Sequence, residues 1–146
     1  MNEIDRAFSF ITSQLTADAT LTPLLPGGIH QGAAPALVAG VPYLVFGHQG
    51  GHDVVVSGMR RVMNDGLYRV IVWGPAEESY AAIAAADDEA DVALTRKSGA
   101  AGADGKVLQC AREQPLALDD VVNGIRWIGL GGMYRIAVQP ASGLAQ

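Results

Sequence analysis

The chain has a single cysteine among its 146 residues, so no disulfide can form within it. That residue, Cys110, lies in the run Lys106 to Arg112, which has the composition of a half-buried strand. A lone thiol in a strand usually packs as a small hydrophobic side chain. We therefore expect a buried thiol at Cys110, with a reactive thiol as the less favoured alternative.

Long hydrophobic runs are also missing. Arginine, glycine or proline interrupts the apolar runs well before the ~20 residues that a membrane span requires. The first residues, Met1 to Asp5, lack the basic start of a secretory signal. We expect a protein that is made in the cytoplasm and has no membrane partner.

Basic residues are scarce. The chain has 10 Lys and Arg against 15 Asp and Glu, which gives a net charge of −5 and a pI of about 5.0. Sequence-independent binding to nucleic acid depends on basic side chains that neutralise the phosphates. The composition argues against DNA as a ligand, although an acidic wall would let DNA slide past as a passenger.

Catalytic motifs are absent as well. The sequence has no Gly-x-Ser-x-Gly elbow and no Walker loop. Gly129-x-Gly131-Gly132 is the nearest match to a phosphate-binding loop, but such a loop must open a helix, and strand-forming residues follow here. We expect a bulge or tight bend in a strand at these glycines. The sequence predicts no enzymatic activity and no cofactor.

One cluster, His48, His52 and Asp53, resembles a set of metal ligands. A His-x3-His spacing places both rings on one side only in a helix, and the intervening Gly50-Gly51 disfavours a helix. Histidines in a polar loop are the alternative interpretation. A small metal- or ligand-binding α+β protein that uses these three residues is the competing hypothesis for function.

Apolar and polar residues alternate with helical periodicity in two segments. The first helix begins after the cap residue Asn2, and the second begins at Pro75 and ends before Ser98-Gly99. The acids Asp87 to Asp91 of the second helix are expected on a solvated face. The predicted apolar faces are Ile4, Ala7, Phe8, Ile11 and Leu15 in the first helix and Tyr80, Ile83, Ala86, Ala90 and Leu94 in the second.

Strand-forming runs fill most of the remaining chain. Pro115 predicts the end of a strand or an edge position, Asn123-Gly124 predicts a tight hairpin turn, and residues 21–28 and 99–105 have the composition of turns or loops. The expected strands are residues 29–31, 43–46, 54–57, 67–73, 106–112, 125–128 and 133–138.

This order of elements predicts one domain over residues 1–146, with residues 139–146 as a loose tail. We expect an α+β fold: a mostly antiparallel sheet, two helices packed on one face and a long β-hairpin arm. The arm comprises residues 47–66, whose glycines raise the entropic cost of ordering. We expect it to be loosely ordered in the free subunit and to contact neighbours, with an idle hairpin tip as the alternative. Its candidate interface residues are Met59, Arg60, Arg61, Val62 and Met63, because methionine and arginine are enriched at interfaces.

Taken in order, these segments resemble the tail terminator (tail-completion) proteins of long-tailed bacteriophages and related gene-transfer particles. The similarity covers nearly the whole chain, from the N-terminal amphipathic helix and Pro42–Phe46 through Tyr68–Trp73 and the helix after Pro75 to the closing Gly131–Val138. Such proteins form a hexameric ring on the finished tail tube, end its polymerisation and present a surface to the head connector.

The resemblance implies a structural virion protein at the neck of the particle, made in the host cytoplasm, without catalytic residues. Its implied partners are further copies of itself, the tail tube protein and the head-completion or connector protein. DNA would pass through the ring's channel, and we expect acids to outnumber bases on its inner wall. Another neck component or a tube protein is the nearest alternative.

Overall fold

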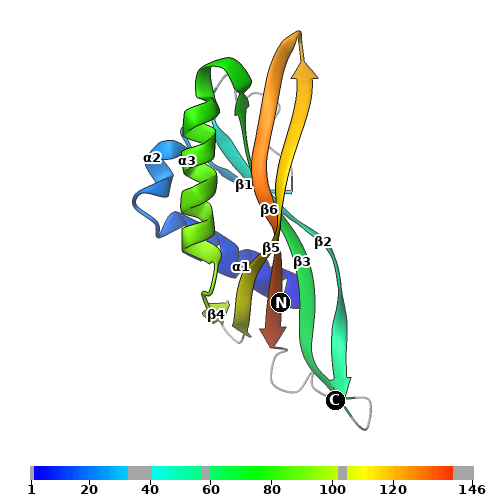
Figure 1. Ribbon diagram of the computed structural model, residues 1–146. Helices are drawn as coiled ribbons and strands as arrows, with labels where there is room; N and C mark the ends of the chain where they lie inside the picture. The colour runs from blue at the N-terminus through cyan, green and yellow to red at the C-terminus, as the bar shows by residue number, and fades with distance from the viewer. Residues whose placement is uncertain (1, 33–40, 57–59, 102–104, 140–146) are drawn as a thin grey trace.

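The computed structural model describes residues 2–32, 41–56, 60–101 and 105–139. Within these ranges the chain forms three helices and one six-stranded sheet in the order β1-β2-β3-β6-β5-β4 (Figure 1). β1 and β2 are parallel, and every other neighbouring pair is antiparallel. The predicted α+β class with a mostly antiparallel sheet is confirmed. The elements are α1 (Glu3–Thr16), α2 (Leu21–Leu24), β1 (Ile29–Gln31), β2 (Tyr43–Val56), β3 (Arg60–Pro75), α3 (Ala76–Leu94), β4 (Gly99–Ala101), β5 (Gly105–Val122) and β6 (Ile125–Gln139).

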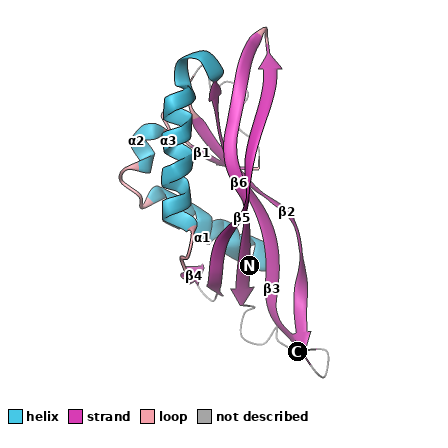
Figure 2. Ribbon diagram, viewed as in Figure 1, coloured by secondary structure: helices cyan, strands magenta, loops and turns pink. Residues whose placement is uncertain are grey.

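The helices lie on one side of the sheet (Figure 2). Even-numbered residues of β3 and β6 face this side, since successive strand residues alternate between the two faces. We call the opposite side the outer face, and no helix in the described part of the chain covers it. The core residues that β3 and β6 direct toward the helices are Tyr68, Val70, Val72, Tyr134, Ile136 and Val138, each at most 2% exposed.

Helix α1 begins at the predicted cap. The Asn2 side chain accepts a hydrogen bond from the Asp5 backbone N–H at 2.8 Å, and the Asp5 carboxylate accepts one from the Asn2 backbone N–H at 3.4 Å. This capping box satisfies two N–H groups that a helix start leaves unpaired. Of the predicted apolar face, Ala7, Ile11 and Leu15 are buried, Ile4 and Phe8 are half-buried, and Phe10 is a further buried member.

The short helix α2 lies in a segment predicted as turns only. The Asp18 carboxylate accepts hydrogen bonds from the backbone N–H groups of Thr20 and Leu21, both at 2.9 Å. These contacts start a helical turn before Pro23 can interrupt it. The prediction missed this cap because Asp18 stands outside the proline- and glycine-rich run.

Helix α3 begins after Pro75, which is its N-cap residue and has an extended backbone conformation. Four of its predicted apolar residues are buried, but Tyr80 is 54% exposed, so that part of the prediction is wrong. None of the described helices is long and apolar enough to cross a bilayer. The buried four are Ile83, Ala86, Ala90 and Leu94.

The strands extend further than predicted. β2 continues through Gly47 to Val56, and β3 begins at Arg60, so the described part of the predicted arm is a paired two-stranded ribbon. β5 continues through Pro115, which lies on an edge strand beyond the end of β4, where proline is tolerated. Gly99–Ala101, predicted as a loop, forms β4. The β2–β3 and β5–β6 ribbons project in opposite directions (Figure 1).

A bulge or tight bend was predicted at Gly129-x-Gly131-Gly132, and the bulge is wrong for the β3–β6 pairing, because β6 keeps its register with β3 throughout. Close approach explains these glycines instead. A Cβ atom on Gly131 would lie 2.0 Å from the Val70 carbonyl oxygen, and one on Gly132 would lie 2.5 Å from the Arg112 Nε atom. β6 therefore needs residues without side chains where it lies against Val70 of β3 and Arg112 of β5. The register shifts lie on β5, at residues 107–109 and 112–114.

The β5–β6 ribbon closes through the predicted two-residue turn. Asn123 and Gly124 have φ angles of 52° and 75°, the left-handed conformation that a type I′ hairpin turn requires at both positions. Val122 and Ile125 pair directly on either side of the turn. The ribbon is thus regularly paired up to its tip.

We expect Gly131→Ala to lower the free energy of unfolding by about 3 kcal/mol, because the added methyl would collide with the backbone of β3. Gly47→Ala is the matched control: it is also a strand glycine, but its nearest neighbour is the Arg69 side chain at 3.4 Å, an ordinary contact. Its effect should stay within about 1 kcal/mol. Urea unfolding measures both, and equal midpoints for the two variants would refute the close-approach explanation.

Candidate functional site: an assembly surface

The proposed arm residues lie at the distal end of the β2–β3 ribbon. Met59 lies outside the described residues, and the Arg60 backbone pairs with Val56 in the ladder. Val62 and Met63 are half-buried, and Met63 lines a hollow of about 230 Å³ on the outer face. A contact role for these residues remains a prediction.

Arg61 binds within its own chain. Its Nη2 atom lies 2.7 Å from Glu3 Oε1, and its Nη1 atom lies 3.6 Å from Asp53 Oδ2. The Glu3 side chain is only 10% exposed, so losing Arg61 would leave a largely buried carboxylate unpaired. Arg61 thereby ties the ribbon to the first turn of α1.

The three predicted metal ligands do not converge. His48 pairs with Tyr68, and a register shift after His48 makes His52 pair with Asp65. Tyr68 faces the helices and Asp65 faces the outer side, so the two histidines lie on opposite faces. The His52 Nε2 atom lies 3.9 Å from Asp65 Oδ2, and Asp53 accepts a hydrogen bond from the Asn64 side chain. Among the described residues, no group of three His, Cys, Asp or Glu is placed to hold a metal ion.

Two of the four acids between Asp87 and Asp91 on α3 face the sheet, which corrects the prediction of a fully solvated acidic face. The Asp91 carboxylate accepts hydrogen bonds from the Tyr134 hydroxyl at 3.0 Å and from the Thr95 hydroxyl. Asp87 Oδ2 lies 3.5 Å from Arg112 Nη2. These contacts join α3 to β5 and β6.

Two carboxylates and one guanidinium meet in this interface, together with the Tyr134 hydroxyl. Burial raises the pKa of Asp87, and the neighbouring Arg112 charge opposes that shift. Burial and the nearby Asp91 carboxylate raise the pKa of Tyr134, so its hydroxyl stays protonated and donates at neutral pH. Clusters of perturbed groups often mark catalytic sites, but each of these groups is bonded to another across the helix–sheet interface. The cluster fastens α3 to the sheet.

The thiol of Cys110 has no exposed surface, and burial raises its pKa to about 12. A thiol with this pKa is protonated at neutral pH, and the thiolate is the nucleophilic form. The expectation of a buried, hydrophobic cysteine is confirmed.

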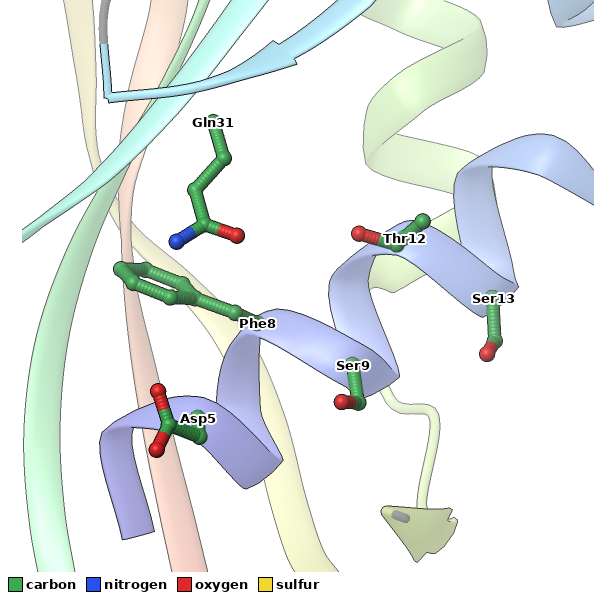
Figure 3. A pocket seen from close by; sticks show the side chains of 6 residues that line it. All are labelled: Asp5, Phe8, Ser9, Thr12, Ser13 and Gln31. Atoms are coloured by element: carbon green, nitrogen blue, oxygen red, sulfur yellow. The ribbon is translucent and has the colours of Figure 1, made fainter. Parts of the chain in front are cut away.

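An open hollow of about 540 Å³ lies between α1 and the end of β1 (Figure 3). The Gln31 amide lies over the Phe8 ring. The hydroxyls of Ser9, Thr12 and Ser13 lie on the α1 side of the hollow. Its one carboxylate, Asp5, already serves the α1 cap. No histidine, cysteine or lysine occurs among the described lining residues, so they offer no nucleophile and base pair. The lining consists of Asp5, Phe8, Ser9, Thr12, Ser13 and Gln31.

The distal half of the β5–β6 ribbon is the main exposed apolar feature that the sequence prediction missed. Its large apolar side chains stand free of the helices, and exposed apolar clusters of this kind mark interaction sites. Apolar residues continue past Pro115 on both sides of the Asn123-Gly124 turn, and this signal in the sequence could have revealed the ribbon. The exposed fractions are 38% for Leu118, 67% for Val121, 47% for Val122 and 55% for Ile125.

A third hollow, of about 270 Å³ and separate from the one at Met63, lies on the outer face at the base of the β5–β6 ribbon. Tyr43, which lines it, also packs against Trp127 at a ring-centroid distance of 6.0 Å. We call it the outer-face hollow. Its lining consists of Gly32, Tyr43, Val45, Arg69, Ile71, Trp73 and Leu118.

The fold has a counterpart among solved structures. A chain of the structure described as "Virion of native gene transfer agent (GTA) particle" superposes with a TM-score of 0.67 at 22% sequence identity. The match covers 88% of this chain and 91% of that chain, so the two share a fold over nearly their full lengths. No protein-family model matches the sequence, and no curated protein matches it.

We expect Tyr134→Phe to lower the free energy of unfolding by about 2 kcal/mol, because the Asp91 carboxylate loses a hydrogen-bond donor inside the interface. Tyr80→Phe is the matched control, since its side chain is 54% exposed, and its effect should be near zero. Thermal unfolding followed by circular dichroism compares them. Equal stability in both variants would show that the Tyr134 hydroxyl does not fasten α3.

We expect zinc to bind no more tightly than it does to isolated surface histidines, because His48 and His52 lie on opposite faces. His48→Ala and His52→Ala should therefore each leave the zinc affinity unchanged in isothermal titration. Tight binding that both substitutions weaken would reinstate the metal hypothesis.

Proposed function

We propose that this chain is a structural virion protein: a ring-forming tail terminator that ends polymerisation of the tail tube and joins the tube to the head connector. The observation that carries the proposal is the fold shared with a chain of a gene transfer agent virion, at a TM-score of 0.67 over nearly the full length of both. The sequence resemblance to tail terminators supplies the finer role. The proposed site of action is the neck of the particle.

The shape of the subunit supports an assembly role. The β2–β3 and β5–β6 ribbons project in opposite directions from the sheet, so one subunit can reach neighbours on two sides (Figure 1). Repeated contacts of this kind build closed rings when the rotation between subunits closes. We propose a hexamer, with Arg60–Met63 of the β2–β3 ribbon among its contacts.

The placement of charged groups also supports this role. Arg135 donates to Glu113 at 2.6 Å and to Asp65 at 3.3 Å, which lowers the pKa of Glu113 through its hydrogen bond. Arg61 and Arg112 pair with acids of their own chain as well. With a net charge of −5, the subunit suits a channel through which DNA passes without binding.

Deleting the gene from the phage or gene-transfer genome that encodes this chain tests the proposal. We expect tails longer than normal and of irregular length, detached from heads, because nothing would stop polymerisation of the tube. Electron microscopy of the particles measures the length distribution. Supplying the gene on a plasmid should restore uniform length and head joining.

The other outcomes identify the alternatives. Tails of normal length without heads would indicate a head-completion protein, and particles with no tubes would indicate a tube protein. Intact infectious particles would exclude any required virion role and favour the small ligand-binding hypothesis. Each of these results contradicts the tail-terminator proposal.

A further inference from the structure

The tip of the β5–β6 ribbon presents an apolar surface on the outer-face side. Val122 pairs with Ile125 and Asp120 pairs with Trp127, and directly opposed residues of an antiparallel pair share one face. Trp127 contacts Tyr43 on the outer face, so Val122, Ile125 and Asp120 point to that side. We call these three residues the outer tip.

The helix-facing side of the same tip has a different composition. Val121 pairs with Arg126, and Arg126 Nε donates to Asp119 Oδ1 at 2.8 Å. This ion pair neutralises both of its members, whereas the Asp120 carboxylate accepts one hydrogen bond within the described part of the chain, from the adjacent Val121 backbone N–H. The outer tip therefore combines two exposed apolar side chains with one carboxylate, Asp120, which forms no ion pair with a described residue.

The outer-face hollow has the complementary composition. Its described walls are mainly apolar and aromatic, and Arg69 is the one charged residue among the described lining residues. No carboxylate of the described residues lies within ion-pairing distance of Arg69. At about 270 Å³ the hollow is smaller than the roughly 300–1,000 Å³ of pockets for drug-sized ligands. Its size suits one or two inserted side chains.

The tip cannot fill the hollow of its own subunit. Leu118 lines the hollow, and Val122 lies four residues further along a paired strand, which places the tip about 13 Å away at the usual rise per residue. The pairing continues up to the type I′ turn, so the ribbon has no unpaired stretch at which it could fold back.

We propose that the outer tip of one copy inserts into the outer-face hollow of the next copy, with Val122 and Ile125 against its apolar wall and Asp120 beside Arg69. Every copy carries both the tip and the hollow, so a second copy of this chain always supplies the matching chemistry. The inference rests on the proposed function, since it supplies a contact between subunits of the ring. Because the tip and the hollow are different patches of one subunit, the contact can repeat from copy to copy, and such head-to-tail contacts form a ring when the rotation between copies closes.

A matched pair of substitutions tests the contact. Val122→Lys places a charge on the outer tip, where it would meet Arg69 in an apolar hollow, and Val121→Lys places the same charge on the opposite side of the ribbon. Both residues are well exposed, so both variants should fold as the wild type does. We expect Val122→Lys to raise the dissociation constant for self-association at least tenfold in analytical ultracentrifugation, and Val121→Lys to leave it unchanged.

Disulfide trapping locates the contact independently. Purified Val122→Cys and purified Tyr43→Cys are mixed at high concentration under mild oxidation, with Cys110 buried and unreactive. We expect a mixed disulfide between the two chains and none when Val121→Cys replaces Val122→Cys. A double variant, Asp120→Arg with Arg69→Asp, should regain the self-association that either single change weakens.

Wild-type protein that stays monomeric up to about 1 mM and forms no mixed disulfide overturns the inference. So does equal weakening by Val121→Lys and Val122→Lys, or a tip that crosslinks to another protein of the particle and not to a second copy. These measurements use purified protein, whereas the proposed function is tested by the tail-length distribution. Irregular tails in the deletion with no tip-to-hollow contact would leave the function standing and remove this inference alone.

Discussion

The close approach of β6 to β3 is the constraint on which the rest of the fold depends. At Gly131 the two backbones leave no room for even a methyl group, and β6 keeps its register through this point. Because β6 pairs with β3 on one side and with β5 on the other, it joins the two ribbons into one sheet. The ribbons project in opposite directions because β3 and β6 are antiparallel, which sets the two hairpin ends at opposite ends of the sheet.

Because Gly131 and Gly132 have no side chains, there is also room for the contacts that join α3 to the sheet. The Arg112 guanidinium occupies the space beside Gly132, donates to the Gly131 carbonyl and reaches Asp87 on α3. One side chain thus joins two strands and a helix where the backbone lies closest. A buried ion pair is weak evidence for added stability, but losing one partner leaves the other charge buried. Arg112 is therefore best understood as fixing how α3 lies on the sheet.

Local chemistry in the sequence predicted a good part of this fold. The Asn2 cap, the Asn123-Gly124 turn and the alternation in residues 67–73 are each set by neighbours a few positions apart. The prediction ended β2 at Gly47 because glycine and polar residues break the strand pattern, yet pairing with β3 extends that strand to Val56. Tertiary pairing overrides weak local preference in such cases.

The candidate site was harder to predict for the same reason. The sheet-facing position of Asp91 depends on Tyr134, 43 residues away, and no local pattern shows that partner. The hollow likewise gathers side chains from β2, β3 and β5. The order of elements did carry the resemblance to tail terminators, since element order is a property of the whole chain, but the surfaces that such a protein would use depend on contacts between distant segments.

The position of β6 in the sheet has a consequence for biosynthesis. β6 is synthesised after the other described strands, yet it fills the centre of the sheet, between β3 and β5. Until it arrives, the nascent chain exposes one unpaired edge on β3 and nearly the whole of β5, both long enough to pair with strands of other chains. A chain truncated before β6 would keep those edges open, so its solubility in the cell depends on completing translation through residue 139.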